Sequence, residues 1–155
     1  ILKLYHIGIV LKARQKMRIT QEGDYAFRVV LYLSKLGMNQ RVEAKTISES
    51  ENIPLRFLLK LLRKLAMAGI VKSYRGVGGG YIIAQEPKKI TLKAVLEAIE
   101  GPIYINRCLY EPEFCNLQRA GYCNVHKALE KVQLGLVESL ESISFQDLID
   151  GEISR

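Results

Sequence analysis

The most constraining feature of this sequence is a glycine-rich stretch between two short apolar segments. Residues 69–84 read GIVKSYRGVGGGYIIA, with strand-like segments around Val71 and Ser73 before the glycines and around Tyr81 and Ile83 after them. Glycine adopts the positive φ angles that a tight hairpin tip requires, so the pattern predicts a two-stranded β-hairpin. A phosphate-binding glycine loop is the competing interpretation, but it needs a following Lys-Ser/Thr and a helix, and here a strand follows.

Three helices are predicted before the hairpin. Thr20 is the expected N-cap of the first, which has apolar residues at helical spacing and ends at Gly37. The second runs from about Glu43 to Ser50, and a turn over residues 51–53 follows it. This turn leads into the third helix, and two short helices joined by so tight a turn are typical of a helix-turn-helix unit. The apolar residues of the first helix are Ala26, Val29, Val30, Leu33 and Leu36.

The third helix begins at Pro54, where the missing proline N–H costs nothing, and it ends before Gly69 at the C′ position. It has an apolar and a basic face. On a recognition helix such cations meet phosphates and base edges, although a basic face is also common on a solvated helix. A helix-turn-helix unit followed by a hairpin is a winged helix, whose tip residue Arg75 could enter a minor groove. The apolar face holds Leu58, Leu61, Leu62 and Leu65, and the basic face holds Arg56, Lys60, Arg63 and Lys64.

Charge is distributed unevenly along the chain. The formal net charge is +7; residues 17–90 carry 13 basic and 6 acidic side chains, whereas residues 91–155 carry 6 basic and 10 acidic ones. This asymmetry favours a polyanion partner for the basic part. Residues 1–16 are apolar and basic, and we expect them to be an N-terminal extension that comes from an upstream start or was added for expression. A weak signal peptide and a short DNA-binding arm are the alternatives.

A fourth helix and a long loop are predicted after the hairpin. Thr91 caps this helix, and Gly101 with Pro102 stops it. Residues 102–123 then show no strong periodicity. A loop of this length inside a compact domain is usually functional.

A long amphipathic helix is predicted over residues 124–142. Its apolar side chains recur at spacings of three or four residues, which indicates a dimerisation helix or, alternatively, packing within the chain. Ser144 and Asp147 then form the pattern of a capping box for a short last helix. The recurring apolar residues are Val125, Leu129, Val132, Leu136, Leu140 and Ile143.

The chain has 3 cysteines, Cys108, Cys115 and Cys123, and all of them lie in the long loop. This small odd number argues against a secreted disulfide scaffold. Three thiolates from an irregular loop can ligate an iron–sulfur cluster; a zinc site and unliganded or redox-switching thiols are the alternatives. A fourth ligand is needed, and the candidates are His126, one helical turn after Cys123, and Asp24.

An enzyme is not expected. The only histidines are His6 and His126, and no nucleophile–base pair or metal site with an open position is evident. A thiol enzyme that uses Cys123 with His126 remains open, as does a redox or cluster-carrier protein without a DNA role, although the basic helix and the wing argue against the latter. No membrane partner is expected, because no apolar run approaches the roughly 18 residues of a membrane span.

The chain resembles the IscR/NsrR-type winged-helix regulators of bacteria, the Rrf-two family, which also includes the cysteine-metabolism repressor CymR. The resemblance extends from Met17 to about Gly151. It is carried by four features together: residues 17–20 (MRIT) followed by 24–26 (DYA), residues 58–65 leading into Gly69, the wing at residues 75–81 (RGVGGGY), and the cysteine loop between Gly101-Pro102 and the long helix.

The resemblance implies a mainly α fold with a small β-hairpin wing. A winged helix-turn-helix DNA-binding domain would occupy residues 17–90, and the cysteine loop and dimerisation helices would occupy residues 91–155. The implied function is that of a cytoplasmic, homodimeric regulator, usually a repressor, that binds a palindromic operator in double-stranded DNA. An iron–sulfur cluster would sense iron, redox or nitric oxide status. The alternative is a cluster-free regulator of the CymR kind, controlled by a small molecule or a protein partner.

The resemblance also implies the site residues. Cys108, Cys115 and Cys123 would ligate the cluster, with His126 at the histidine position of IscR-like members or Asp24 of the partner subunit at the aspartate position of NsrR-like members. Histidine ligation favours a [2Fe–2S] over a [4Fe–4S] cluster. The cysteine spacing departs from the usual family spacing, which leaves the cluster type and the fourth ligand open. The residues expected to contact DNA are Arg56, Phe57, Lys60, Arg63, Arg75 and Gly76.

Overall fold

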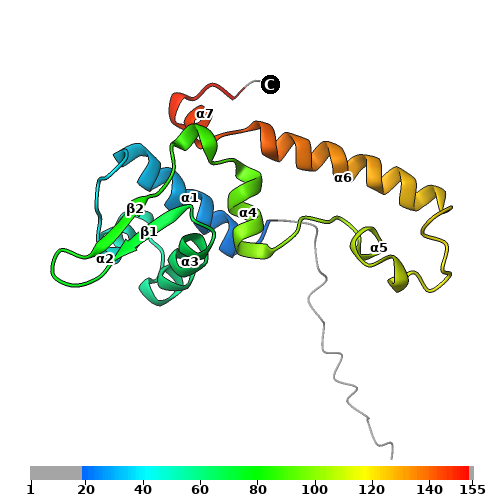
Figure 1. The fold of residues 1–155 in the computed structure, drawn as a ribbon, viewed down its shortest axis with the longest axis horizontal. Helices are drawn as coiled ribbons and strands as arrows, with labels where there is room; N and C mark the ends of the chain where they lie inside the picture. The colour runs from blue at the N-terminus through cyan, green and yellow to red at the C-terminus, as the bar shows by residue number, and fades with distance from the viewer. Residues whose placement is uncertain (1–18, 154–155) are drawn as a thin grey trace, which may run out of the picture.

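A computed structural model describes residues 19–153 of the chain. It is mainly helical with one β-hairpin, as expected (Figure 1). The helices are α1 (Gln21–Leu36), α2 (Ala44–Glu51), α3 (Leu55–Met67), α4 (Leu92–Glu100), α5 (Arg107–Tyr110), α6 (Asn124–Ser142) and α7 (Phe145–Asp150); the strands are β1 (Val71–Tyr74) and β2 (Gly80–Ile83); and single 3-10 turns lie at η1 (Pro87–Lys89) and η2 (Pro112–Phe114).

One apolar core lies beneath the helix-turn-helix unit and the hairpin. Helices α1 to α4 each contribute buried side chains to it, and α7 adds Phe145, which is fully buried near Phe27 of α1. The backbones of α4 and α7 begin side by side, since Leu92 donates to the Ile143 carbonyl at 3.0 Å and Phe145 donates to the Ile90 carbonyl at 2.9 Å. The last helix therefore packs against the winged-helix body. In the sequence, however, it belongs to residues 91–155, which were expected to form the second region.

The expected helix ends are largely confirmed. Thr20 caps α1 by accepting from the Gly23 amide at 3.3 Å, and Ser144 forms the expected capping box with Asp147. Two details differ from expectation. Pro54 is the N-cap residue of α3 and lies one position before the helix. Leu36 is 39% exposed, because it lies in the last turn of α1, where the helix leaves the core.

Thr91 gives a direct test of the capping energetics. Its hydroxyl accepts from the Ala94 amide at 3.1 Å at the start of α4. We expect Thr91→Ala to lower the free energy of unfolding by about 1 kcal/mol, because the Ala94 N–H loses its partner. Urea denaturation measures this effect. Thr46→Ala, at an exposed position inside α2, is the matched control and should change stability by less than about 0.5 kcal/mol.

The predicted hairpin is present, and it has one additional backbone partner. β1 and β2 pair antiparallel, from Val71 opposite Ile83 to Tyr74 opposite Gly80. Val42, in the loop before α2, exchanges two backbone hydrogen bonds with Tyr81, at 3.0 and 2.8 Å. A single residue of the α1–α2 loop thus forms an isolated antiparallel bridge with the β2 edge.

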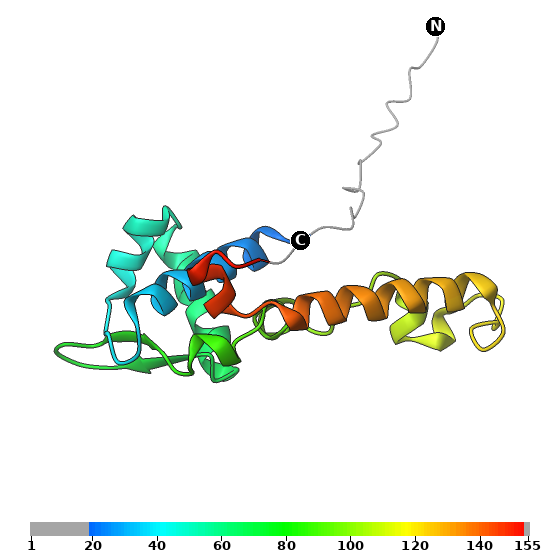
Figure 2. The same ribbon diagram turned by 90° about the horizontal axis from the view of Figure 1, so that it is seen from above.

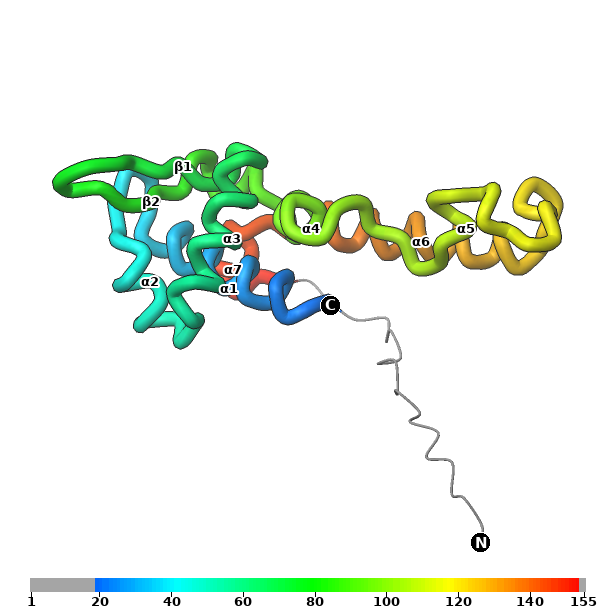
Figure 3. Tube along the Cα trace, turned by 90° about the horizontal axis from the view of Figure 1, so that it is seen from below, coloured from blue at the N-terminus to red at the C-terminus, as the bar shows by residue number. Residues whose placement is uncertain are grey.

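Helices α5 and α6 project away from the winged-helix body and run beside each other (Figures 2 and 3). The long helix spans the predicted range, but none of its residues is buried. Gln133 on α6 accepts from the Ile105 amide at 2.9 Å and also donates to the Ile103 carbonyl, which fastens the segment after α4 to α6. The short helix α5 lies in the loop for which no helix was predicted, because a single turn is too short to show periodicity.

Candidate functional site

The recognition helix α3 presents its basic face to solvent. Arg56, Lys60 and Arg63 are exposed, while the leucines on the opposite face are buried in the core. Phe57 is half-buried and packs edge-on against Tyr25 of α1, with ring centroids 5.5 Å apart. This contact packs α3 against α1, and Phe57 remains partly exposed.

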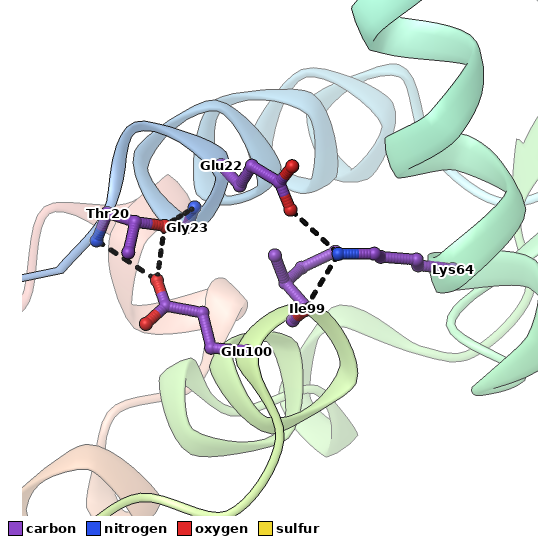
Figure 4. Close-up of polar contacts among 6 residues, drawn as sticks. All are labelled: Thr20, Glu22, Gly23, Lys64, Ile99 and Glu100. Atoms are coloured by element: carbon purple, nitrogen blue, oxygen red, sulfur yellow. Dashed lines mark hydrogen bonds and ion pairs between the residues drawn. The ribbon is translucent and has the colours of Figure 1, made fainter.

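Lys64 does not belong to this basic face, contrary to expectation. Its Nζ donates to Glu22 Oε2 of α1 at 2.7 Å and to the carbonyl of Ile99 in α4 at 3.0 Å (Figure 4). Beside it, Glu100 accepts from both the backbone N–H and the hydroxyl of Thr20, at 3.0 and 2.7 Å. Lys64 lies at the border between the two faces of α3, so its long side chain turns inward to connect three helices.

The wing turn is exposed at the end of the hairpin, and Arg75 at its beginning shares a groove with α3. Arg75 and Gly76 are exposed in this turn, and Val77 is completely exposed. Arg63 of α3 and Arg75 both line a groove of about 630 Å³ that lies between α3 and the hairpin. The structure therefore brings the predicted cations of the helix and of the wing to one groove.

The cysteines come from three separate points of the loop. Cys108 lies in α5, Cys115 directly follows η2, and Cys123 is the N-cap residue of α6; all three are half-buried free thiols. Cys108 Sγ lies 3.5 Å from Nδ1 of His126, in the first turn of α6. His126 was predicted to lie near Cys123 because the two are one helical turn apart. In the structure, the side chain of His126 contacts Cys108 of α5.

Cys115 occupies a different environment. The backbone N–H of Arg119 donates to its Sγ at 3.4 Å, and this bond, with the amide of Leu117, lowers the pKa of the Cys115 thiol below its ordinary value. Backbone amides that point at sulfur favour the thiolate, which is the form that binds metals and reacts with oxidants.

The candidate ligands are not gathered at one point. Across residues 19–153, no three His, Cys, Asp or Glu side chains lie close enough to hold a metal ion. Asp24 is largely exposed on α1, where Arg28 is 3.9 Å away. The donor set of three thiols and one imidazole nevertheless suits an iron–sulfur cluster or zinc, with Cys108 and His126 as the pair already in contact.

Comparison with known proteins identifies the family. Residues 19–151 match the model of the Rrf2 family, described as an iron-dependent transcriptional regulator. The chain belongs to the Rrf2 family. The Rrf2 relatives include the HTH-type transcriptional regulator CymR of Bacillus subtilis, 30% identical over 139 residues, which are 88% of this chain and 94% of CymR. They also include IscR of Aliivibrio salmonicida, 30% identical over 140 residues, which are 90% of this chain and 82% of IscR.

Solved structures of Rrf2 proteins share the fold. The structure of CymR, the global cysteine regulator of B. subtilis, has a TM-score of 0.68 at 27% identity and covers 86% of this chain and 96% of CymR. T. potens IscR has a TM-score of 0.68 at 24% identity, with 90% and 93% of the two chains covered. The predicted winged-helix class and the predicted family are confirmed. No helix between residues 19 and 153 is both long and apolar enough to cross a membrane.

Three side chains that organise this Rrf2 fold carried no sequence signal. In the sequence, Lys64 is one of several cations on the basic face of its helix, and Glu100 is an ordinary acidic residue at a helix end. Arg41, which contacts the Gly78 carbonyl of the wing, lies in an irregular loop. Their roles depend on neighbours far away in sequence, such as Thr20 for Glu100 across 80 positions.

Proposed function

We propose that this Rrf2 protein is a dimeric transcriptional repressor of the cytoplasm that binds a palindromic DNA site and senses through its cysteine loop. The observation that carries the DNA-binding part is the groove shared by α3 and the wing, with Arg63 and Arg75 on its two sides. A recognition helix and a wing that present cations together suit the major groove and the adjacent minor groove of one duplex.

The roles that we propose for the exposed residues of α3 and the wing are supported by their positions. Arg56 and Lys60 lie on the exposed face near the start of α3, which is the part of a recognition helix that reaches base edges. Arg63, one turn later, would contact phosphate, and Arg75 would enter a narrow minor groove from the wing. Phe57 and Gly76 would contribute apolar and backbone contacts. Each phosphate contact makes binding weaker as salt rises.

Arg75→Ala tests the DNA-binding proposal. We expect it to weaken binding to the preferred DNA site by about 1–3 kcal/mol, because a minor-groove cation is lost. Fluorescence anisotropy on a labelled duplex, selected by the wild-type protein from a randomised library, measures the loss. Lys88→Ala, which removes an exposed cation on η1, is the control for net charge. Equal affinities of the Arg75→Ala and Lys88→Ala variants would exclude the wing from recognition.

For the sensing part, we propose that Cys108, Cys115 and Cys123 hold an iron–sulfur cluster with His126 as the fourth ligand. When bound, the cluster would supply a centre that responds to iron supply, oxidants or nitric oxide. The Cys108–His126 contact supports this assignment because it already brings two donors together from α5 and α6. The pKa-lowering amides at Cys115 favour its ligating thiolate form. Asp24 of the partner subunit is the alternative fourth ligand.

A cluster-free regulator of the CymR kind is the second candidate. It is favoured by the separation of Cys115 and Cys123 from the Cys108–His126 pair, since no three donors meet within residues 19–153. Here the thiols would act as redox switches. Anaerobic purification, a visible spectrum, and iron and sulfide counts separate the two candidates: a brown protein with matched iron and sulfide supports the cluster, and a protein that stays colourless after reconstitution supports the cluster-free regulator.

In both candidates, a change in the cysteine loop would reach α3 through the same chain of contacts. His126 and Gln133 lie on α6, and Gln133 holds the segment that continues α4. The end of α4 in turn holds Lys64 of α3 through the Ile99 carbonyl. A change in the order of the cysteine loop would thereby alter the position of α3 relative to its partner copy, and a few kcal/mol between two arrangements would suffice to change operator occupancy.

A further inference from the structure

We propose that Arg41 is a positioning residue for DNA recognition, which fixes the wing turn from which Arg75 reaches the minor groove. This inference rests on the proposed DNA-binding function and assigns a role to a residue outside the recognition helix and the wing. Arg41 lies in the loop between α1 and α2, one residue before the backbone pair that Val42 makes with Tyr81.

The Arg41 side chain contacts both sides of the wing turn. Its Nη1 donates to the Gly78 carbonyl at 2.7 Å, and its guanidinium carbon lies 4.1 Å from the centroid of the Tyr74 ring. Tyr74 ends β1 and immediately precedes Arg75, while Gly78 lies on the returning side of the turn. A charged hydrogen bond and a cation–π contact therefore meet on one guanidinium, and together they span the peptide that carries Arg75.

The backbone beside Arg41 brings the side chain within reach of the turn. Val42 exchanges two hydrogen bonds with Tyr81, which fixes the loop against β2. The two chains approach so closely at Gly80 that a Cβ there would lie 2.6 Å from the Val42 carbonyl oxygen and 3.0 Å from Arg41 Cγ. Glycine at this position is thus required for the contact between the loop and the wing.

The wing turn needs such a restraint because its own glycine-rich sequence does little to limit its conformation. Gly76 and Gly78 have φ angles of 86° and 74°, and glycines leave a turn with many accessible conformations. Apart from Arg41, no side chain of residues 19–153 that lies outside the hairpin hydrogen-bonds to residues 75–79. Fixing the turn before DNA arrives removes part of the ordering cost of binding, so Arg41 should raise affinity without touching a base.

A double-mutant cycle on DNA binding tests this role. The probe is the duplex that the wild-type protein enriches from a randomised palindromic library, and the variants are Arg41→Ala, Arg75→Ala, the double variant and the control Lys88→Ala. We expect Arg41→Ala to weaken binding on the order of tenfold, and no more than Arg75→Ala does. In the Arg75→Ala background, Arg41→Ala should have almost no further effect, because the arginine it positions is gone.

Base preference supplies a readout that a general loss of stability would not change. Repeating the selection with Arg41→Ala should flatten the A·T preference at the positions contacted by the wing and leave the preference read by α3 unchanged. If Arg41→Ala does not fold, Arg41→Met takes its place, since it keeps the length of the side chain and removes the donor and the charge.

The outcomes separate this inference from the proposed function. The positioning role would be overturned if the two substitutions weaken binding independently, so that their effects multiply, and if Arg41→Ala also lowers the salt dependence of binding by about one phosphate contact. That result would mean that Arg41 itself binds phosphate. Equal binding by Arg41→Ala and Lys88→Ala would overturn it as well. Failure of the wild-type protein to enrich any duplex would instead reject the proposed DNA-binding function.

Discussion

We expect Val132→Asp to convert the proposed dimer to a folded monomer that does not bind the proposed palindromic DNA site with high affinity. Val132 is 58% exposed in the single chain and lies on one apolar stripe of α6 with Val125 and Leu136. In a two-fold symmetric dimer the same stripe meets itself, so the substitution would place two carboxylates in one interface. Each uncompensated buried charge costs about 3–5 kcal/mol, enough to dissociate a dimer at micromolar concentration.

Leu134→Asp is the matched control for this experiment. Leu134 is 64% exposed and on the same helix, but it lies two residues from Val132 and so about 200° around the helix axis. Sedimentation velocity should show a monomer for Val132→Asp and a dimer for Leu134→Asp, with the same helical circular dichroism for both. A dimer that survives Val132→Asp would place the interface elsewhere, and dissociation by Leu134→Asp alone would place it on the opposite face of α6.

The second large effect is expected at the cysteine loop. If the proposed cluster is present, Cys115→Ala should remove the visible absorption of the anaerobically purified protein, because the variant lacks one of the three thiolates that would hold it. The dimer should stay intact, since Cys115 lies outside the core cluster and outside the α6 stripe. Absorption spectra with iron and sulfide counts measure the loss, and sedimentation velocity measures the dimer.

Asn116→Ala is the control for the loop itself. Asn116 is exposed next to Cys115 and has no place in the proposed donor set, so its variant should keep the colour. A coloured Cys115→Ala protein would contradict the ligand assignment. Loss of colour in both variants would mean that the order of the loop, and not the Cys115 thiolate, retains the cluster.

Much of the secondary structure was predictable because its signals are local. Thr20 caps α1 through an amide three residues away, and Ser144 and Asp147 cap α7 over the same distance. Gly69 ends α3 with a positive φ of 72°, which few other residues adopt easily. The apolar spacing of α6 predicted its range for the same reason, since helical periodicity repeats within each turn.

The candidate DNA-binding surface was predictable in part. A basic face and a glycine-rich turn are visible in the sequence, so the amino-acid pattern alone identifies Arg56 and Arg75 as candidates. Lys64 could not be separated from the cations predicted to contact DNA, because its partners Glu22 and Ile99 are 42 and 35 positions away. A charge pattern gives the face of a helix only approximately, and a long side chain at the border of two faces can turn either way.

The sequence by itself determined the helix ends, the hairpin and the presence of three thiols in one loop, since these depend on residues a few positions apart. Only the tertiary structure decided that Cys108 meets His126, that Arg41 contacts the wing turn and that no residue of α6 is buried. The physical reason is that these contacts join elements whose relative placement is set by the packing of the whole core around α1. No local preference of the residues concerned encodes that placement.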